Sequence, residues 1–191
     1  HLLQQKPVEK GEGPVVLILA PTRELAMQIQ TEAYKYGLAT LQEHNKKKVP
    51  IKSACVYGGD ARRKQITELK QSPQIVIATP GRLLDFLQAK ITNLKRVTYL
   101  VLDEADRMLD MGFAPQIAQI ISQIRQDRQT TMFSATWDVD VQELAQKYLQ
   151  QPLIVNIGSV GMAANRNVDQ KFLFIQESDK PARILKLIDE I

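Results

Sequence analysis

Short apolar runs recur along the chain, separated by longer stretches in which apolar residues have helical spacing. The runs predict strands at Val15–Ala20, Ile51–Tyr57, Gln74–Ala78, Tyr99–Leu102, Thr130–Phe133 and Leu153–Ile157. Most of these runs are apolar throughout, whereas a strand with one solvated face alternates apolar and polar residues. The pattern therefore predicts a parallel sheet that is buried on both faces.

The segments between the strands predict the helices that cover this sheet. They are Glu24 to about Glu43, Ala61–Gln71, Arg82–Ala89, Pro115–Ile124 and Val141–Leu149. In the fourth of them, isoleucines at 117, 120, 121 and 124 recur at spacings of three and four, which puts them on one helix face. Alternating strands and helices with right-handed crossovers predict a doubly wound α/β domain that ends near Gly158.

The remaining residues predict a linker and the beginning of a second domain. Residues 159–169 show little periodicity and are expected to form the linker. A strand, Gln170–Gln176, and a helix that Ser178 or Asp179 opens and that runs to Ile191 then begin the second domain over 170–191. Because the first residue is His1 rather than Met, and the second domain is not completed, we expect a first domain over 1–158 that is cut, and a chain truncated at both ends.

Composition narrows the class of protein. The 191 residues are 44% hydrophobic and 24% charged, as in a soluble globular chain rather than a disordered or fibrous one. The longest apolar run has six residues, Val15 to Ala20, too few for a membrane span of about 20. A single cysteine, Cys55, forms neither an internal disulfide nor a cysteine metal cluster, which favours an intracellular location in the nucleus or the cytoplasm. The net charge of +4 is compatible with nucleic acid without establishing it, and Lys46–Lys48 is better explained as a solvated loop than as a phosphate contact.

Acidic residues follow the predicted strand Tyr99–Leu102. In an open α/β sheet, ligands bind beyond the carboxyl ends of the strands, and here those residues are Asp103-Glu104-Ala105-Asp106. An apolar strand that delivers an acidic pair is the Walker B arrangement of nucleoside triphosphatases, in which the aspartate helps to hold Mg²⁺. The neighbouring carboxylate can orient or deprotonate the attacking water. The alternative, that these acids stabilise the N-terminus of the next helix, stays open on this stretch alone.

Three other strand ends carry candidate anion sites. Pro21-Thr22-Arg23 follows the first strand, where Thr22 can cap the helix while backbone N–H groups and Arg23 face a phosphate. Thr79-Pro80-Gly81-Arg82 follows the third strand, and Gly81 permits close backbone approach. Gly58-Gly59 follows the second strand and precedes three basic residues. An ordinary helix cap, a strand-to-helix turn and a flexible turn are the respective alternatives.

Two hydroxyl residues, Ser134 and Thr136, follow the fifth predicted strand. Hydroxyl groups at a strand end can hydrogen-bond to the carboxylates of a neighbouring strand, which makes them relays rather than catalysts. A local turn or helix cap is the competing explanation. No Gly-x-Ser-x-Gly turn surrounds Ser134, so a nucleophilic role for this serine is disfavoured.

Taken in order, these stretches resemble the first helicase domain of DEAD-box RNA helicases. The defining tetrapeptide stands here as Asp103-Glu104-Ala105-Asp106, and the similarity extends over essentially the whole chain, including Arg107–Phe113 and Trp137. The resemblance implies a RecA-like doubly wound parallel sheet of the P-loop NTPase type. It also implies ATP-dependent RNA helicase activity, with ATP and Mg²⁺ as cofactors and RNA as the partner.

The resemblance also implies roles for individual residues. Asp103 would bind Mg²⁺ through water, and Glu104 would activate the water that attacks the γ-phosphate. Asp106, Ser134 and Thr136 would couple the nucleotide state to closure on RNA. Contacts to the RNA sugar-phosphate backbone would come from Pro21, Thr22, Arg23, Gly58, Gly59, Thr79, Pro80, Gly81 and Arg82. Backbone contacts carry no base information, so sequence-independent binding is expected.

The sequence departs from the family pattern in what it lacks. No Gly-x-x-x-x-Gly-Lys-[Ser/Thr] stretch occurs, although the family carries such a phosphate-binding loop upstream of the position of Pro21. The glutamine-containing adenine-recognition segment and the arginine-rich segments of the second domain are missing too. We therefore expect a helicase fragment. A noncatalytic RNA-binding or scaffold fragment, and a DNA helicase of related architecture, are the alternatives.

The missing loop leads to a prediction for the 191-residue polypeptide by itself. The strand that precedes that loop would sit inside the sheet, so without it neighbouring strands keep unpaired backbone groups and an uncovered apolar surface. We expect the isolated chain to be poorly stable and to show no measurable ATPase activity. An ATPase assay of the purified chain tests this, and RNA-stimulated ATP turnover would contradict it.

Overall fold

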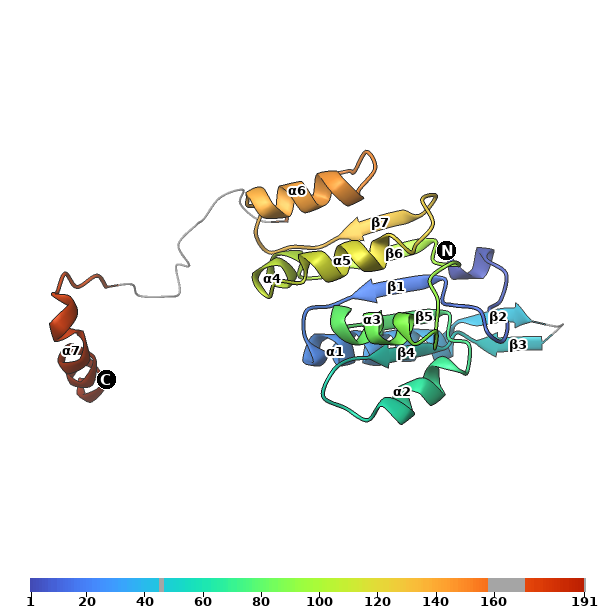
Figure 1. Ribbon diagram of the computed structural model, residues 1–191, viewed down its shortest axis with the longest axis horizontal. Helices are drawn as coiled ribbons and strands as arrows, with labels where there is room; N and C mark the ends of the chain where they lie inside the picture. Colours follow the sequence, from blue (N-terminus) through green and yellow to red (C-terminus); the bar gives the residue numbers. More distant parts are fainter. Residues whose placement is uncertain (45–46, 158–170, 191) are drawn as a thin grey trace. The chain divides into compact units, whose positions relative to one another are not determined.

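The computed structural model describes residues 1–44, 47–157 and 171–190 (Figure 1). The chain divides into two units, His1–Pro152 and Leu153–Ile191. The first unit contains a five-stranded sheet flanked by helices. In the second, a short 3-10 turn, Glu177–Asp179, leads into helix α7 (Lys180–Asp189). The first unit carries all of the candidate site residues.

The sheet of the first unit is parallel throughout. Its strands are β1 (Val16–Leu19), β4 (Ser53–Val56), β5 (Ile75–Ala78), β6 (Tyr99–Leu102) and β7 (Gln129–Met132), in the order β4-β5-β1-β6-β7. This confirms five of the predicted strands, with ends that shift by at most two residues. The register places the last residues of all five strands in one row, so the chain leaves every strand at the same edge.

Helices lie on both faces of the sheet. Successive strand residues point to opposite sides, so the apolar strands present apolar side chains on each face for helices to cover. Leu17 and Leu19 belong to the larger core, whereas Ile18 packs in a second cluster. Residues of α2 (Arg62–Leu69), α3 (Pro80–Gln88), α4 (Ala105–Asp110), α5 (Ala114–Ile121) and α6 (Val139–Tyr148) contribute to the larger core. Helix α1 (Arg23–Ala39) contributes Ala26 to the second cluster. In α5 the isoleucines at 117, 120 and 121 are buried, as their spacing predicts.

The first predicted helix was expected to reach Glu43, and this is wrong. Helix α1 ends at Ala39, and an antiparallel hairpin follows, formed by β2 (Leu41–His44) and β3 (Lys47–Pro50). Gly37 near the helix end lies so close to Ile51 that a Cβ there would be 2.4 Å from the Ile51 carbonyl oxygen. Both Thr40 N and Ile51 N donate to the Gly37 carbonyl, which ends the helix. Of the basic run, Lys46 lies outside the described residues, and Lys48 is exposed on β3.

Two predicted strands are also wrong. No regular secondary structure is present in Leu153–Ile157 or in residues 171–176, which are the described part of Gln170–Gln176. Their apolar side chains are exposed, with 97% of Ile157 and 99% of Phe174 accessible. A strand is stable only when a neighbour completes its hydrogen-bond ladder, and the described residues supply none here. The predicted linker 159–169 and residue Gln170 lie outside the described residues. The helix expected after Ser178 or Asp179 is confirmed as α7, with Asp179 at its N-cap.

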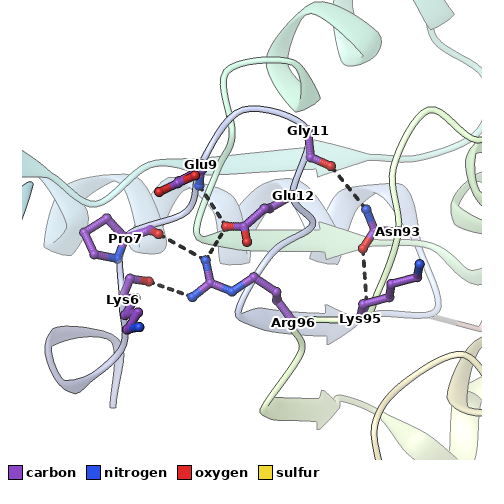
Figure 2. Close-up of polar contacts among 8 residues, drawn as sticks. All are labelled: Lys6, Pro7, Glu9, Gly11, Glu12, Asn93, Lys95 and Arg96. Carbon is purple, nitrogen blue, oxygen red and sulfur yellow. Dashed lines mark hydrogen bonds and ion pairs between the residues drawn. The ribbon is translucent and has the colours of Figure 1, made fainter.

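The segment before β1 is tied to the loop that precedes β6 (Figure 2). The guanidinium of Arg96 donates to the carbonyl oxygens of Lys6 and Pro7 and pairs with the carboxylate of Glu12. The same carboxylate accepts the Glu9 backbone N–H at 2.9 Å. That hydrogen bond first, and Arg96 second, lower the pKa of Glu12 against the effect of burial. Because β1 and β6 are neighbours, this contact holds two central strands together at their amino ends.

The close approach of the two segments gives a stability prediction at Gly13. A Cβ at this position would lie 1.8 Å from the backbone carbonyl oxygen of Asn93, so one of the two segments must shift. We expect Gly13→Ala to lower the free energy of unfolding by about 2 kcal/mol, as overpacking does. Urea unfolding followed by circular dichroism measures the change. Gly58→Ala is the control, because a Cβ there meets nothing within 4 Å, and an equal loss in both variants would contradict the steric explanation.

Candidate functional site

The carboxyl edge of the sheet collects every motif that the sequence singles out. From one end of the edge to the other, the segments that follow β4, β5, β1, β6 and β7 are Gly58-Gly59, Thr79–Arg82, Pro21–Arg23, Asp103–Asp106 and Ser134–Thr136. Motifs far apart in the sequence thus become neighbours through strand order. The acidic and hydroxyl segments occupy one half of the edge, and the glycine- and arginine-containing segments occupy the other.

Asp103 is the first residue beyond β6. Its backbone N–H donates to the Leu19 carbonyl at 3.0 Å, which continues the ladder between β6 and β1 past the end of the strand. Its Oδ1 accepts the Glu104 N–H at 3.0 Å. Burial raises the pKa of the Asp103 carboxyl, and the adjacent Glu104 charge adds to the rise, while the Glu104 N–H opposes it. Asp103 is therefore a rigidly placed carboxylate whose negative charge is poorly compensated.

Glu104 occupies a left-handed backbone conformation, with φ 49° and ψ 56°, immediately before α4. This conformation costs a residue other than glycine roughly 1–2 kcal/mol, so the surroundings must hold it. One stabilising contact is the hydrogen bond that the next residue, Ala105 N, donates to the Phe133 carbonyl at 3.0 Å. The Glu104 side chain makes no capping hydrogen bond to α4, which disfavours the helix-stabilising explanation for this acid. Its Oε2 instead lies 3.3 Å from Nη1 of Arg107. In the sequence, the only sign of this ion pair is the spacing of three residues between the two charges.

Asp106 connects the segment after β6 to the segment after β7. Its Oδ2 accepts hydrogen bonds from Thr136 N at 3.0 Å and from Thr136 Oγ1 at 3.1 Å. Burial alone would raise the pKa of Asp106, but hydrogen bonds from Arg107 N and Thr136 outweigh burial and lower it. The hydrogen bond predicted between the Thr136 hydroxyl and a carboxylate of the neighbouring strand end is thus present. Ser134 Oγ accepts the Asp106 backbone N–H at 3.3 Å, and the Ser134 hydroxyl also helps to lower the pKa of the Asp106 carboxyl.

The segment after β1 combines a helix cap with an exposed cation. Thr22 Oγ1 accepts the Leu25 N–H at 3.3 Å, which confirms the predicted cap of α1. Arg23 is exposed, and its guanidinium carbon lies 5.4 Å from the centroid of the Tyr57 ring. Pro21 is buried, so it shapes the turn and presents no side chain to a ligand.

The glycines of the other two segments leave the backbone accessible. A Cβ at Gly58, Gly59 or Gly81 would meet nothing within 4 Å. Gly59 has a φ of +79°, a backbone conformation that residues with a side chain rarely adopt. Pro80 is buried in the first turn of α3, and Thr79 before it makes no side-chain cap. These segments offer backbone groups to a ligand on the open side of the edge.

Arg82 is held within the protein rather than extended into solvent. Its side chain is only 11% exposed, and Nη1 donates to the Asp60 carbonyl at 3.3 Å and to Gln65 Oε1 at 3.2 Å. Sequence reasoning missed Gln65 and Asp60 as parts of the site. Gln65 had one recognisable signal, since it lies four residues before Leu69 on the buried face of α2, where an apolar residue is expected.

Comparison with known proteins identifies the family. The sequence model of the DEAD/DEAH box helicases matches residues 1–144. The chain belongs to the DEAD/DEAH box helicase family. Two similar proteins are the ATP-dependent RNA helicase DBP2 of Candida glabrata, 54% identical over 189 residues, and that of Schizosaccharomyces pombe, 53% identical over 191 residues. They align with 99% and 100% of this chain, which spans 33% of each of them.

A plant relative and a solved structure agree with this assignment. The DEAD-box ATP-dependent RNA helicase 20 of Arabidopsis thaliana is 50% identical over the full chain, which covers 36% of that protein. The crystal structure of the yeast DEAD-box splicing factor Prp28 superposes with a TM-score of 0.69 at 34% identity, covering 83% of this chain and 37% of the other. The predicted RecA-like α/β fold of this DEAD/DEAH box chain is thereby confirmed. The chain spans about a third of the length of these curated relatives.

The contact between Thr136 and Asp106 gives a prediction for this helicase-family site. Thr136→Val removes the Oγ1 hydrogen bond to Oδ2, so the pKa of Asp106 should rise from its lowered value. A carboxyl whose pKa is lower in the folded than in the unfolded state stabilises the protein at pH values above the unfolded-state pKa. The variant should therefore have a smaller free energy of unfolding at neutral pH. Its difference in free energy of unfolding from the parent should shrink as the pH falls through the titration of Asp106. Carboxyl NMR titration measures the pKa. Thr67→Val, on the exposed side of α2, is the control, and an unchanged Asp106 titration in Thr136→Val would contradict the contact.

Proposed function

We propose that the protein containing this chain is an ATP-dependent RNA helicase. The observation that supports this most is the division of the carboxyl edge. Asp103 and Glu104 lie on the half formed by β6 and β7, and the open glycines and Arg23 lie on the half formed by β4, β5 and β1. The first half suits a nucleotide with its metal ion and the second suits a phosphate backbone. The Asp106–Thr136 contact lies within the nucleotide half and links its two strands.

The acidic half fits a magnesium ion that a nucleotide brings with it. Among the residues that the structure describes, no three His, Cys, Asp or Glu side chains gather as a metal site. Mg²⁺ whose shell is completed by phosphates and water needs only one or two protein carboxylates. Asp103 suits this role, since burial raises its pKa and a cation would offset that effect. When bound, Mg²⁺ with ATP would neutralise developing phosphate charge, and Asp103 would hold it through water.

Glu104 is the proposed general base. It follows Asp103 directly, and its carboxylate is partly exposed, with no buried partner to prevent it from accepting a proton. Its ion pair with Arg107 is solvent-exposed, and exposed pairs contribute only about 0–1 kcal/mol, so water near the γ-phosphate can replace Arg107. Glu104 then orients that water and takes its proton. The held left-handed backbone keeps this carboxylate next to Asp103 without further rearrangement.

The other half of the edge is proposed to bind the RNA sugar-phosphate backbone. Gly58, Gly59 and Gly81 leave room for close approach, Thr79 contributes a hydroxyl that caps no helix, and Arg23 contributes an exposed charge. Contacts of this kind carry no base information, so binding should be independent of sequence. The choice of RNA over DNA is supported by the relatives, which are named RNA helicases. Asp106, Ser134 and Thr136 would couple the nucleotide state to this binding.

Domain organisation and location are part of the same proposal. We assign residues 1–158 to the ATP-binding helicase domain, 159–169 to a linker and 170–191 to the start of a second RecA-like domain. The division of the chain into two units supports a two-part organisation, with that division falling after Pro152. No helix among the described residues is long and apolar enough to cross a bilayer. A nuclear or cytoplasmic location is supported by the single cysteine, which is free and buried.

Glu104→Gln tests the proposed chemistry in the complete protein. The amide keeps the size of the side chain but cannot accept the proton of water, so ATP turnover should fall roughly a hundredfold or more while ATP still binds. Steady-state ATPase kinetics and equilibrium nucleotide binding measure the two effects separately. Asp110→Asn neutralises an exposed acid on the same helix and serves as the matched control. Unchanged turnover in Glu104→Gln would remove this residue from the proposed mechanism.

A further inference from the structure

Gln65 is one of two buried polar residues in the described core, with 2% of its surface exposed. A buried amide is costly unless its polar atoms are hydrogen-bonded. Gln65 Oε1 accepts the Tyr57 N–H at 3.3 Å and Arg82 Nη1 at 3.2 Å, and Nε2 donates to the Tyr57 carbonyl at 3.0 Å. One side chain therefore connects α2, the end of β4 and the first turn of α3.

These contacts flank the Gly58-Gly59 segment on both sides. Tyr57 precedes the glycines, and both of its backbone polar groups bond to Gln65. Asp60 follows the glycines, and its carbonyl accepts Arg82 Nη1 at 3.3 Å while its Oδ2 accepts the Tyr57 hydroxyl at 3.0 Å. The glycines have no side chains that could restrict or hydrogen-bond their own backbone, so their backbone conformation depends on these neighbours.

The same contacts fix the guanidinium of Arg82. Nη1 is directed to Gln65 and Asp60, and the guanidinium carbon lies 5.7 Å from the centroid of the buried Phe86 ring. A guanidinium has five N–H donors in a rigid plane, so fixing one nitrogen fixes the direction of the others. Gln65 thus sets the orientation of a cation on one side and of an accessible backbone on the other.

We propose that Gln65 is a positioning residue for RNA, which holds the Arg82 guanidinium and the Gly58-Gly59 backbone in one geometry for adjacent phosphates. The inference rests on the proposed function of this half of the edge. The position requires an amide, because a donor must face the Tyr57 carbonyl while an acceptor faces Arg82. A carboxylate lacks the donor, and an aliphatic side chain lacks both.

The test compares the complete protein with its Gln65→Met variant, which keeps the side-chain length and loses all three hydrogen bonds. We expect the concentration of single-stranded RNA that gives half-maximal ATPase stimulation to rise about tenfold, in line with the loss of a hydrogen bond to a charged group. The KM for ATP should stay unchanged, because the nucleotide half of the edge does not contact Gln65. Gln71→Met is the matched control, since Gln71 is exposed just beyond α2.

A double-mutant cycle separates positioning from a general loss of stability. If Gln65 acts through Arg82, then Gln65→Met should weaken RNA binding much less in an Arg82→Met background than in the parent. The dependence of RNA affinity on salt should also become shallower in Gln65→Met, because fewer phosphates are contacted. Additive effects in the cycle, or an RNA response equal to that of the parent in a folded Gln65→Met variant, would overturn the proposal.

Folding and function are kept apart by two further measurements. Circular dichroism melting shows whether Gln65→Met is folded at the assay temperature. If it is not, Gln65→Glu is assayed in its place: it keeps the acceptor for Arg82 and loses the donor to the Tyr57 carbonyl, so the RNA concentration for half-maximal stimulation should still rise but less than about tenfold, and an unchanged value would overturn the proposal. If that variant also unfolds, Gln65 serves folding and the proposal fails. A parent protein that shows no RNA-stimulated ATPase would instead refute the proposed helicase function itself.

Discussion

Backbone hydrogen bonds continue past the ends of the strands, and the placement of four of the five segments at the carboxyl edge depends on them. Thr79 N donates to Val56 O, Ala20 N to Ala78 O, Asp103 N to Leu19 O, and Phe133 N to Leu102 O. Each bond fixes the first residue beyond one strand against the last residue of the neighbouring strand. Side chains that follow are therefore placed by the sheet rather than by flexible loops. A constraint made only of backbone groups tolerates wide variation in the core, provided that the strands stay in register.

Two carboxylates three residues apart illustrate what this placement does to charge. Asp103 and Asp106 have pKa values shifted in opposite directions. Burial dominates at Asp103, which receives one hydrogen bond from the adjacent backbone, whereas hydrogen bonds from Arg107 N–H and from the N–H and hydroxyl of Thr136 outweigh burial at Asp106. Environments that separate the pKa values of neighbouring acids also separate their roles. The first suits an acid that binds a cation, and the lowered pKa of the second suits a carboxylate that is ionised at neutral pH and connects two segments.

Sequence periodicity predicted the parts of the fold that burial controls. The five paired strands are short and mostly apolar, and the isoleucines of α5 mark its buried face, so one pattern determines each of them. The hairpin β2–β3 was missed because Gly37 ends α1 through a contact with Ile51. Ile51 lies beyond the sequence window in which helical periodicity is read. Leu153–Ile157 has the composition of a strand but no neighbour to pair with among the described residues. At the site, the motif residues were found, but the inward orientation of Arg82 depends on Gln65, seventeen residues away, and no local pattern reveals it.

The anchoring of the amino-terminal segment has a mechanical consequence. Arg96 joins residues 6–12 to the loop before β6, and the segment continues directly into β1, which lies between β5 and β6. A pulling force on residues 6–12 is therefore transmitted to two neighbouring strands at once, so it strains the hydrogen-bond ladders on both sides of β1.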